Sequence, residues 1–132
     1  MSFELGAFYT RDEINAVIGS KETMPFLAVS EGKIVGAFLT DELNRKAPRL
    51  IYVGTGPNRA RRAEQLATQE EAIPVFRKGN KGGAYATRFE YVGNWVCEKY
   101  DTDEQMILTA QEDSPKAIAG VLCMREVKQS KV

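Results

Sequence analysis

The segment from residue 84 to residue 100 places the strongest constraint on how this chain can fold. It is rich in aromatic and β-branched side chains, which fit strands better than helices. Gly93 interrupts the segment, and a glycine inside a strand pattern marks a bend or a bulge. The pattern therefore predicts a long bent strand, or a hairpin kinked at Gly93.

Three other segments carry helix signals, at residues 11–18, 59–70 and 102–111. Apolar residues recur in them at helical spacing. Before the first segment, Thr10 and Glu13 have the spacing of a capping box, and Gly19 is placed to end the helix. We expect Asn58 and Thr102 to cap the second and third helices.

Short apolar runs separated by turn signals predict further strands, at residues 25–30, 33–39, 50–53, 73–76 and 118–127. Glu31-Gly32 joins the first two runs as a hairpin. Residues 41–49 form a polar loop and residues 79–83 a glycine-rich turn. Short strands with few helices predict an α+β fold, a curved or barrel-like mixed β-sheet with about three helices. A length of 132 residues fits one compact domain, 1–132.

The composition excludes several kinds of site. The chain has no histidine and only two cysteines, Cys97 and Cys123, so His-dependent catalytic triads and a closed zinc site are absent. Both cysteines lie in apolar strand patterns and are expected to be ordinary buried thiols. We expect no cofactor, no metal and no catalytic residue. No apolar run approaches the ~20 residues of a membrane span, and we expect a cytoplasmic protein without membrane contact.

The charges are unevenly distributed along the chain. Residues 43–62 hold six basic side chains and no acidic one, whereas residues 1–42 hold three basic and seven acidic ones. A polyanion is attracted to the central segment and repelled by the N-terminal one. The alternative is a solvated surface on which these charges pair with the acidic flanks.

Two strand patterns resemble a stretch of SRA and related PUA-like domains. The first is Ile73-Pro74-Val75-Phe76-Arg77-Lys78, and the second, after a glycine-rich turn, is Phe89-Glu90-Tyr91-Val92-Gly93-Asn94-Trp95-Val96. The helical region before them (54–69) and the final helix and strand (102–127) agree with the same resemblance. It implies a PUA-like fold and a module that reads modified DNA, often after flipping a base out, as in modification-dependent restriction endonucleases.

Base reading needs flat walls for stacking and polar groups for the edge of the base, with cations for the phosphates. The candidate base pocket consists of Asn44, Tyr52, Thr55, Gln69, Tyr85, Tyr91 and Trp95. The candidate phosphate-binding residues are Arg49, Arg59, Arg61, Arg62, Arg77, Lys78, Lys81 and Arg88. We expect the arginines of 59–62 and Trp95 to meet at one hollow. For each aromatic residue the alternative is core packing, because the odd positions of 89–95 share one face of a strand.

Other functions stay open at this point. Tyr52-Val53-Gly54 followed by Arg59 and Arg62 resembles the second half of the GIY-YIG nuclease motif, but the preceding strands lack a matching tyrosine. Glu31 and Lys33 match the end of a metal-dependent nuclease pattern. Backbone amides of 54–58 could hold a single phosphate. A small protein-interaction factor or inhibitor subunit is the remaining alternative. The residues favour a nucleic-acid-binding module over an enzyme, with DNA favoured over RNA.

Overall fold

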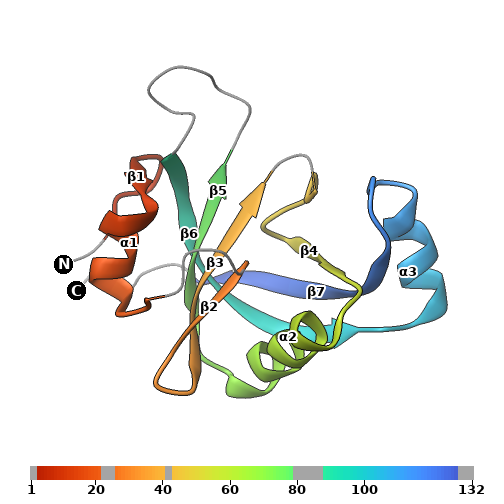
Figure 1. The fold of residues 1–132 in the computed structure, drawn as a ribbon. Coiled ribbons are helices and arrows are strands. Elements are labelled where there is room, and N and C mark those ends of the chain that lie inside the picture. Colours follow the sequence, from red (N-terminus) through yellow and green to blue (C-terminus); the bar gives the residue numbers. More distant parts are fainter. Residues whose placement is uncertain (1–2, 22–25, 41–42, 79–87, 128–132) are drawn as a thin grey trace.

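The computed structural model describes residues 3–21, 26–40, 43–78 and 88–127, which form three helices and seven strands (Figure 1). The strands are β1 (Phe8–Thr10), β2 (Leu27–Ser30), β3 (Lys33–Thr40), β4 (Leu50–Gly54), β5 (Ile73–Lys78), β6 (Arg88–Asp101) and β7 (Ile118–Val127). The helices are α1 (Arg11–Ile18), α2 (Pro57–Gln69) and α3 (Glu104–Gln111).

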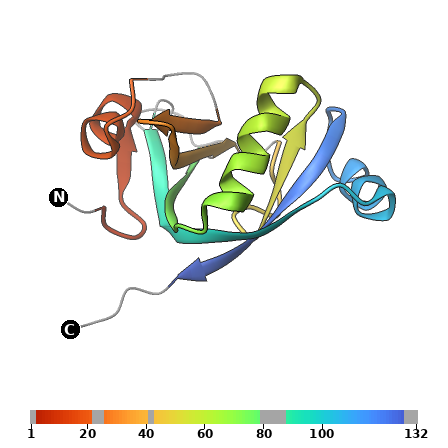
Figure 2. The same ribbon diagram turned by 90° about the horizontal axis from the view of Figure 1, so that it is seen from below.

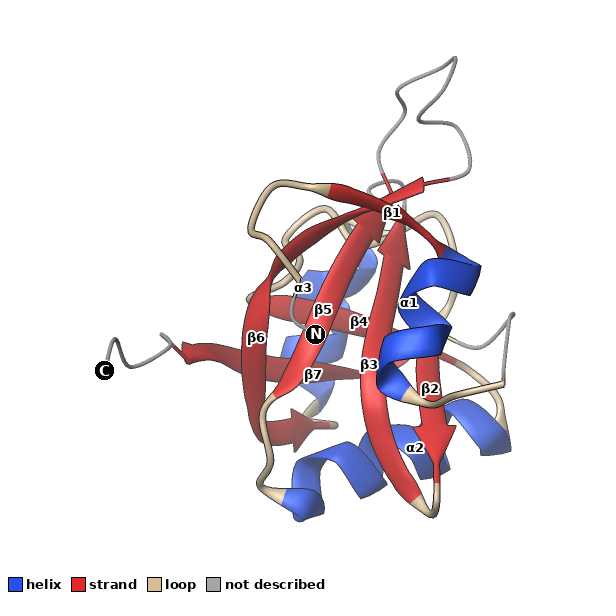
Figure 3. Ribbon diagram, turned by 90° about the vertical axis from the view of Figure 1, so that its left-hand side faces the viewer, coloured by secondary structure: helices blue, strands red, loops and turns tan. Residues whose placement is uncertain are grey.

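The described strands form one mixed sheet in the order β2-β3-β5-β6-β7-β4, and β1 pairs with the start of β6. β3 and β5 are parallel, and the other pairings are antiparallel. The sheet curls strongly, so that β4 and β7 cross behind β3 and β5 (Figure 3). The expected α+β class, with a curved mixed sheet and about three helices, is confirmed.

Strand β6 holds the curled sheet together. It is 14 residues long and pairs with β5 over its first half and with β7 over its second half. At Asn94 and Trp95 it pairs with both neighbours. Gly93 lies beside this crossover with a φ of 108°, a conformation that favours glycine. The predicted long strand bent at Gly93 is therefore confirmed, while its first residues, 84–87, and the turn at 79–83 lie outside the described residues.

The hairpin prediction is also confirmed. β2 and β3 are antiparallel, and Glu31 and Gly32 between them have φ values of 51° and 79°. Two successive positive φ values are typical of the tight turns that match the twist of paired strands. Strand β1 was not expected from the sequence, because its three residues are too few to show a period of two.

The three helices lie along the molecule with α2 between α1 and α3 (Figure 2). α1 spans the predicted residues, with Thr10 and Glu13 forming the capping box and Gly19 in the left-handed conformation at its end. In the described part of the chain, no helix combines the length and the hydropathy that crossing a membrane requires.

Two predicted helix caps are wrong. α2 begins at Pro57 with Gly56 as its N-cap, so Asn58 lies inside the first turn. Proline is well suited to that first position, because its fixed φ is helical and it has no N–H to leave unsatisfied. α3 is capped by Asp103, whose carboxylate accepts from the backbone N–H of Gln105, and not by Thr102.

The described core separates into three clusters, of which the smallest joins Tyr52 to Ala110 of α3. Ala63 and Leu66 of α2 pack against a large cluster that includes Ile51 and Val75. A side chain buried as fully as Leu66 stabilises the fold by about 1.5–3 kcal/mol. In another cluster, Ile14 of α1 packs with aromatic rings, Phe38, Phe76 and Tyr91. The candidate site lies beside these clusters, where β3 and β4 end.

Candidate nucleic-acid interface

A cavity of about 1180 Å³ opens where strands from both sides of the curled sheet end. Phe38 and Thr40 line it from the end of β3, and Tyr52 and Gly54 line it from the end of β4. The start of α2 and the loop before β7 also line it, together with single residues of other elements. We call this hollow the basic cavity, for the reason given next.

Five basic side chains line the basic cavity: Arg11, Arg59, Arg62, Lys78 and Lys116. They come from α1, α2, β5 and the loop before β7, so only folding brings them together. Among the described lining residues there is no Asp or Glu. Like charges gathered around a hollow raise the local concentration of anionic ligands. The cavity is therefore an attractive site for a polyanion.

The N-terminal end of α2 adds to this positive field. Gly56 provides no side-chain cap and has a φ of 137°, and the first turn of the helix holds no acidic residue. The uncapped N–H groups and the helix dipole favour an anion at this end. Arg59 is positioned here by a hydrogen bond of 3.1 Å from its guanidinium to the carbonyl of Thr55.

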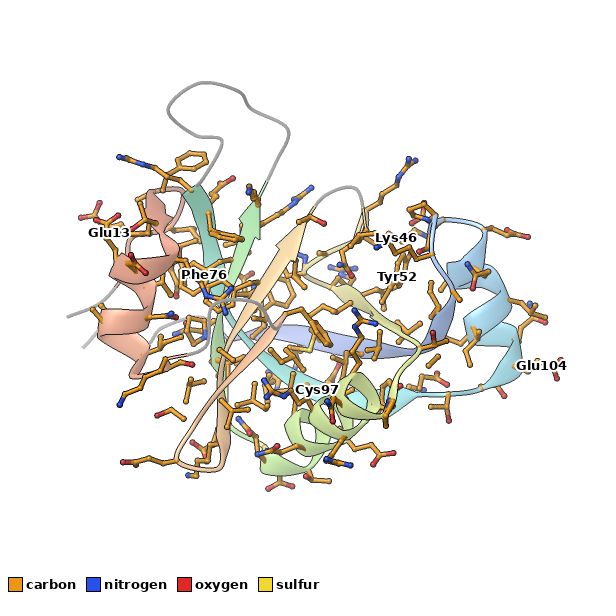
Figure 4. The ribbon with its side chains drawn as sticks, viewed as in Figure 1. Glu13, Lys46, Tyr52, Phe76, Cys97 and Glu104 are labelled. Carbon is orange, nitrogen blue, oxygen red and sulfur yellow. The ribbon has the colours of Figure 1, made fainter. Side chains whose placement is uncertain are left out.

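Tyr52 forms a fixed wall of the basic cavity. Its backbone N–H donates to Asn44 Oδ1 at 2.7 Å, and its hydroxyl donates to Asp113 Oδ2 at 2.7 Å. Burial, and then the hydrogen bond to Asp113, raise the pKa of Tyr52 to about 12. Figure 4 places this residue on the part of β4 that faces α3. The Tyr52 side chain is 7% exposed and packs with Ala110, Ile118 and Val121, so it lines the cavity as part of the packed core.

A stack of aromatic and cationic groups lies on the opposite wall. The guanidinium carbon of Arg11 lies 3.4 Å from the centroid of the Phe38 ring, a close cation–π contact. The Phe38 ring is also stacked on Phe76 and meets the edge of Phe89. Both Phe38 and Phe89 line the cavity. These contacts hold the positively charged guanidinium of Arg11 against the phenylalanine rings that line the cavity.

The structure brings about half of the sequence-predicted site residues together. Six of them line the basic cavity: Asn44, Tyr52, Thr55, Arg59, Arg62 and Lys78. Arg62 also donates to the carbonyl of Leu27 at 2.7 Å, which ties α2 to β2. Tyr85 and Lys81 lie outside the described residues.

Three residues of the predicted base pocket lie elsewhere. Tyr91 is 5% exposed and packs in the aromatic cluster under α1. Trp95 packs against the large core cluster, and its indole N–H donates to the carbonyl of Val92. Gln69 bonds to the backbone of Ile34 at the far end of α2. The expected meeting of Trp95 with the arginines of α2 does not occur.

The remaining predicted phosphate ligands are spread over other surfaces. Arg49 precedes β4 and Arg61 lies on α2, both exposed and neither lining the cavity. Arg77 is half-buried on β5, next to Lys78 but on the opposite face of the strand. Arg88 is exposed at the start of β6, opposite Thr10. Arg77 and Lys78 are adjacent in the sequence but point to opposite faces, because successive side chains of a strand alternate between its two faces.

Several cavity residues were not found by sequence reasoning, namely Arg11, Phe26, Phe38, Phe89 and Lys116. Arg11 lies inside a capping box and Lys116 follows a helix-breaking Ser-Pro pair, so both have ordinary surface patterns. The phenylalanines lie in or beside strands and fit core packing equally well. Only the curl of the sheet, which is not encoded in any short pattern, brings them to one hollow.

The two thiols lie apart from the cavity. Cys97 is buried on β6, and burial raises its pKa to about 11. Burial also raises the pKa of Cys123 on β7. Both thiols therefore stay protonated near neutral pH, although Cys123 is only half-buried, so the expected full burial holds for Cys97 alone. Within the described ranges, the structure contains no group of three or more His, Cys, Asp or Glu side chains suited to holding a metal ion.

The sequence matches no family model and no curated protein. The fold, by contrast, is similar to solved SRA domains. The SRA domain of SUVH5 in complex with hemimethylated CG DNA matches with a TM-score of 0.62 and 14% identity, over 100% of this chain and 94% of that chain.

Two longer proteins contain a similar unit. KRYPTONITE in complex with mCHG DNA and SAH matches with a TM-score of 0.62 and 12% identity, over 98% of this chain and 33% of that one. The sulfur-binding and SRA domains of ScoMcrA with phosphorothioated DNA match with a TM-score of 0.54 and 17% identity, over 98% of this chain and 41% of that one. With the curled sheet and three helices described above, these matches show that the chain has the fold of an SRA domain.

Proposed function

We propose that this protein is a DNA-binding module that reads a modified base held in the basic cavity. The observation that carries the proposal is the convergence of five cations, from distant parts of the chain, around a cavity walled by an immobilised tyrosine ring. Cations alone would support general DNA binding. The ring and the buried polar groups beside it are what support the reading of a base.

The cations that line the cavity supply the charge that a phosphate-binding surface needs. Arg59 and Arg62 lie about one turn apart on α2, and Arg11, Lys78 and Lys116 lie on other elements around the cavity. Contacts to phosphates position a nucleic acid without reading its sequence. The choice of DNA rests on the similar solved structures, which are complexes with methylated or phosphorothioated DNA.

The cavity is large enough for a base turned out of the duplex. Enzymes and readers that reach a base in this way stack it on aromatic rings and recognise its hydrogen-bonding edge. Tyr52 supplies a ring that is held at its backbone and at its hydroxyl, so little conformational freedom is lost on stacking. Stacking on such a ring contributes about 1–3 kcal/mol per base.

The nuclease alternative gains no support at Tyr52. With a pKa of about 12, its phenol stays protonated at neutral pH and donates to Asp113, so it is poorly suited to act as a general base. Glu31 and Lys33, the other nuclease pattern, lie at the hairpin between β2 and β3, where Lys33 pairs with Glu71.

A DNA-binding titration tests the proposal. Matched labelled duplexes are used, either unmodified or carrying a single methylated or hydroxymethylated base or a phosphorothioate linkage, at several salt concentrations. We expect binding that weakens with salt, with a log–log slope of roughly −3 to −4.5 for three to five phosphate contacts. One modified duplex should bind more tightly than its unmodified form. Undetectable binding of every duplex at low salt would refute the proposal.

Two arginine variants locate the binding surface. Arg59→Ala removes a cation that lines the cavity, and Arg125→Ala removes an exposed cation on β7 that pairs with Glu98 at 3.6 Å. Arg59→Ala should weaken binding several-fold and reduce the salt slope by about one, whereas Arg125→Ala should leave both unchanged. Equal effects of the two variants would assign the binding to net charge and not to the cavity.

A further inference from the structure

Asn44 offers the basic cavity an amide NH₂ group and not an oxygen. Its Oδ1 accepts the backbone N–H of Tyr52 at 2.7 Å. An N–H can only donate, so the amide atom that faces it must be the oxygen. Asn44 lines the cavity, and its NH₂ group is the part of the amide that is still available to a ligand.

The side chain of Asn44 is held in this orientation. It is 6% exposed, its backbone N–H donates to Thr40, and its carbonyl accepts from Ala47. Turning the amide over would place its NH₂ against the N–H of Tyr52 and leave two buried donors without acceptors. That arrangement costs about 1–3 kcal/mol for each group. Among the described residues, the structure gives the NH₂ group no acceptor, so a ligand in the cavity is free to supply one.

The described wall holds more donors than acceptors, although Thr40, Thr55 and Asn58 add side chains that can both donate and accept. The charged lining residues are all cations, which only donate. The Tyr52 hydroxyl is used by Asp113, and Ser114 Oγ both donates to the carbonyl of Lys116 and accepts its N–H. The carbonyl of Thr55 accepts from Arg59. The described wall therefore favours ligands that present acceptors.

We propose that Asn44 makes the cavity selective for modified bases that carry a carbonyl oxygen at the edge where cytosine carries an amino group, such as 5-hydroxymethyluracil. The carbonyl accepts from Asn44, whereas the amino group of a cytosine placed in the same way meets the NH₂ as a second donor. This inference rests on the proposed function and adds the class of base that is read.

Two duplexes that differ only in the target base pair provide the test. One carries 5-hydroxymethyluracil and the other 5-hydroxymethylcytosine, each opposite its normal partner. Binding of each is measured with the wild-type protein and with Asn44→Asp. The carboxylate of this variant still accepts from Tyr52 and presents an oxygen to the cavity. The free energy of opening each base pair is the same whether the wild-type protein or the variant binds. The change in the ratio of the two duplex affinities between wild type and variant therefore isolates the effect of residue 44.

We expect the wild-type protein to bind the 5-hydroxymethyluracil duplex about tenfold more tightly, and Asn44→Asp to shift the ratio by at least that factor toward 5-hydroxymethylcytosine. Asn44→Ser keeps an oxygen for Tyr52 but no NH₂, and it should lose the preference without gaining the opposite one. If Asn44→Asp does not fold, this second variant decides the test.

The outcomes separate the two proposals. A ratio that stays within twofold in the variants, with salt-dependent binding of both duplexes, overturns the selectivity and leaves the DNA-binding function standing. A wild-type preference for 5-hydroxymethylcytosine that the variants retain also overturns the selectivity. Failure of the wild-type protein to bind either duplex at low salt overturns both.

Discussion

At its C-terminal end, helix α2 is fastened to the β2–β3 hairpin, whereas its N-terminal end faces the basic cavity. Gln69 donates to the carbonyl of Ile34 at 2.8 Å and accepts its N–H at 3.0 Å. Gln65 donates to the carbonyl of Gly32, and Lys33 pairs with Glu71 at 2.7 Å. At the other end, Gly56 provides no side-chain cap and the neighbouring side chains are basic.

This difference separates polar groups that stabilise the fold from those that are available to a ligand. Gln69 and Asn44 were both candidates for reading a base edge. Gln69 uses both ends of its amide on one backbone residue, while Asn44 uses only its oxygen. A polar side chain is thus assigned to structure or to binding by how much of its hydrogen-bonding capacity the fold has already used.

The largest expected effect is a loss of folding stability when the hydrogen bonds between Gln69 and the β2–β3 hairpin are removed. Gln69→Ala removes the partners of two part-buried backbone groups of Ile34. The free energy of unfolding should fall by about 2 kcal/mol. Thermal or urea unfolding measures the change, and Thr68→Ala, at an exposed neighbouring position, is the control. DNA binding measured well below the melting temperature should be unchanged, and a selective loss of binding would return Gln69 to the site.

A smaller change in stability is expected at the N-terminal end of α2, which lacks a side-chain cap. Asn58 lies within the first turn of α2 and does not cap it, so Asn58→Ala should change the free energy of unfolding by less than about 0.5 kcal/mol. Asp103→Ala removes a true cap from α3 and should cost about 1 kcal/mol. Urea unfolding of the two variants side by side provides the measurement. A loss at Asn58 as large as that at Asp103 would mean that Asn58 caps α2 after all.

The last effect does not change stability at neutral pH and is visible only in alkaline solution. Burial and Asp113 raise the pKa of Tyr52 from 10.0 to about 12, so the folded protein holds this proton more tightly than the unfolded chain does. The resulting stabilisation is complete below pH 10 and is lost as the pH rises from 10 through 12. The ultraviolet absorbance of tyrosinate should show a late titration step that Tyr52→Phe removes. If that variant keeps the late step, another tyrosine is responsible for it.

Local patterns predicted most of the elements of this fold. The capping box, the Glu31-Gly32 turn and the apolar runs depend on neighbouring residues, and the structure confirms them. The caps of α2 and α3 were misplaced by two residues and one, because several polar residues adjoin each helix start and only the final geometry selects one. The prediction of the site was partial for a related reason. Alternation shows which residues share a face of a strand, but not which face meets solvent or core.

The sequence alone therefore determined most of the secondary structure, the α+β class and the presence of a basic segment, since these follow from interactions between residues close along the chain. Tertiary structure alone decided that Arg11 and Lys116 join Arg59 at one cavity, that Trp95 and Tyr91 pack inside, and that Asn44 lines the cavity with its Oδ1 bound to Tyr52. The physical reason is the curl of the sheet about β6, which brings the ends of β3 and β4 together and leaves other strand positions covered by helices.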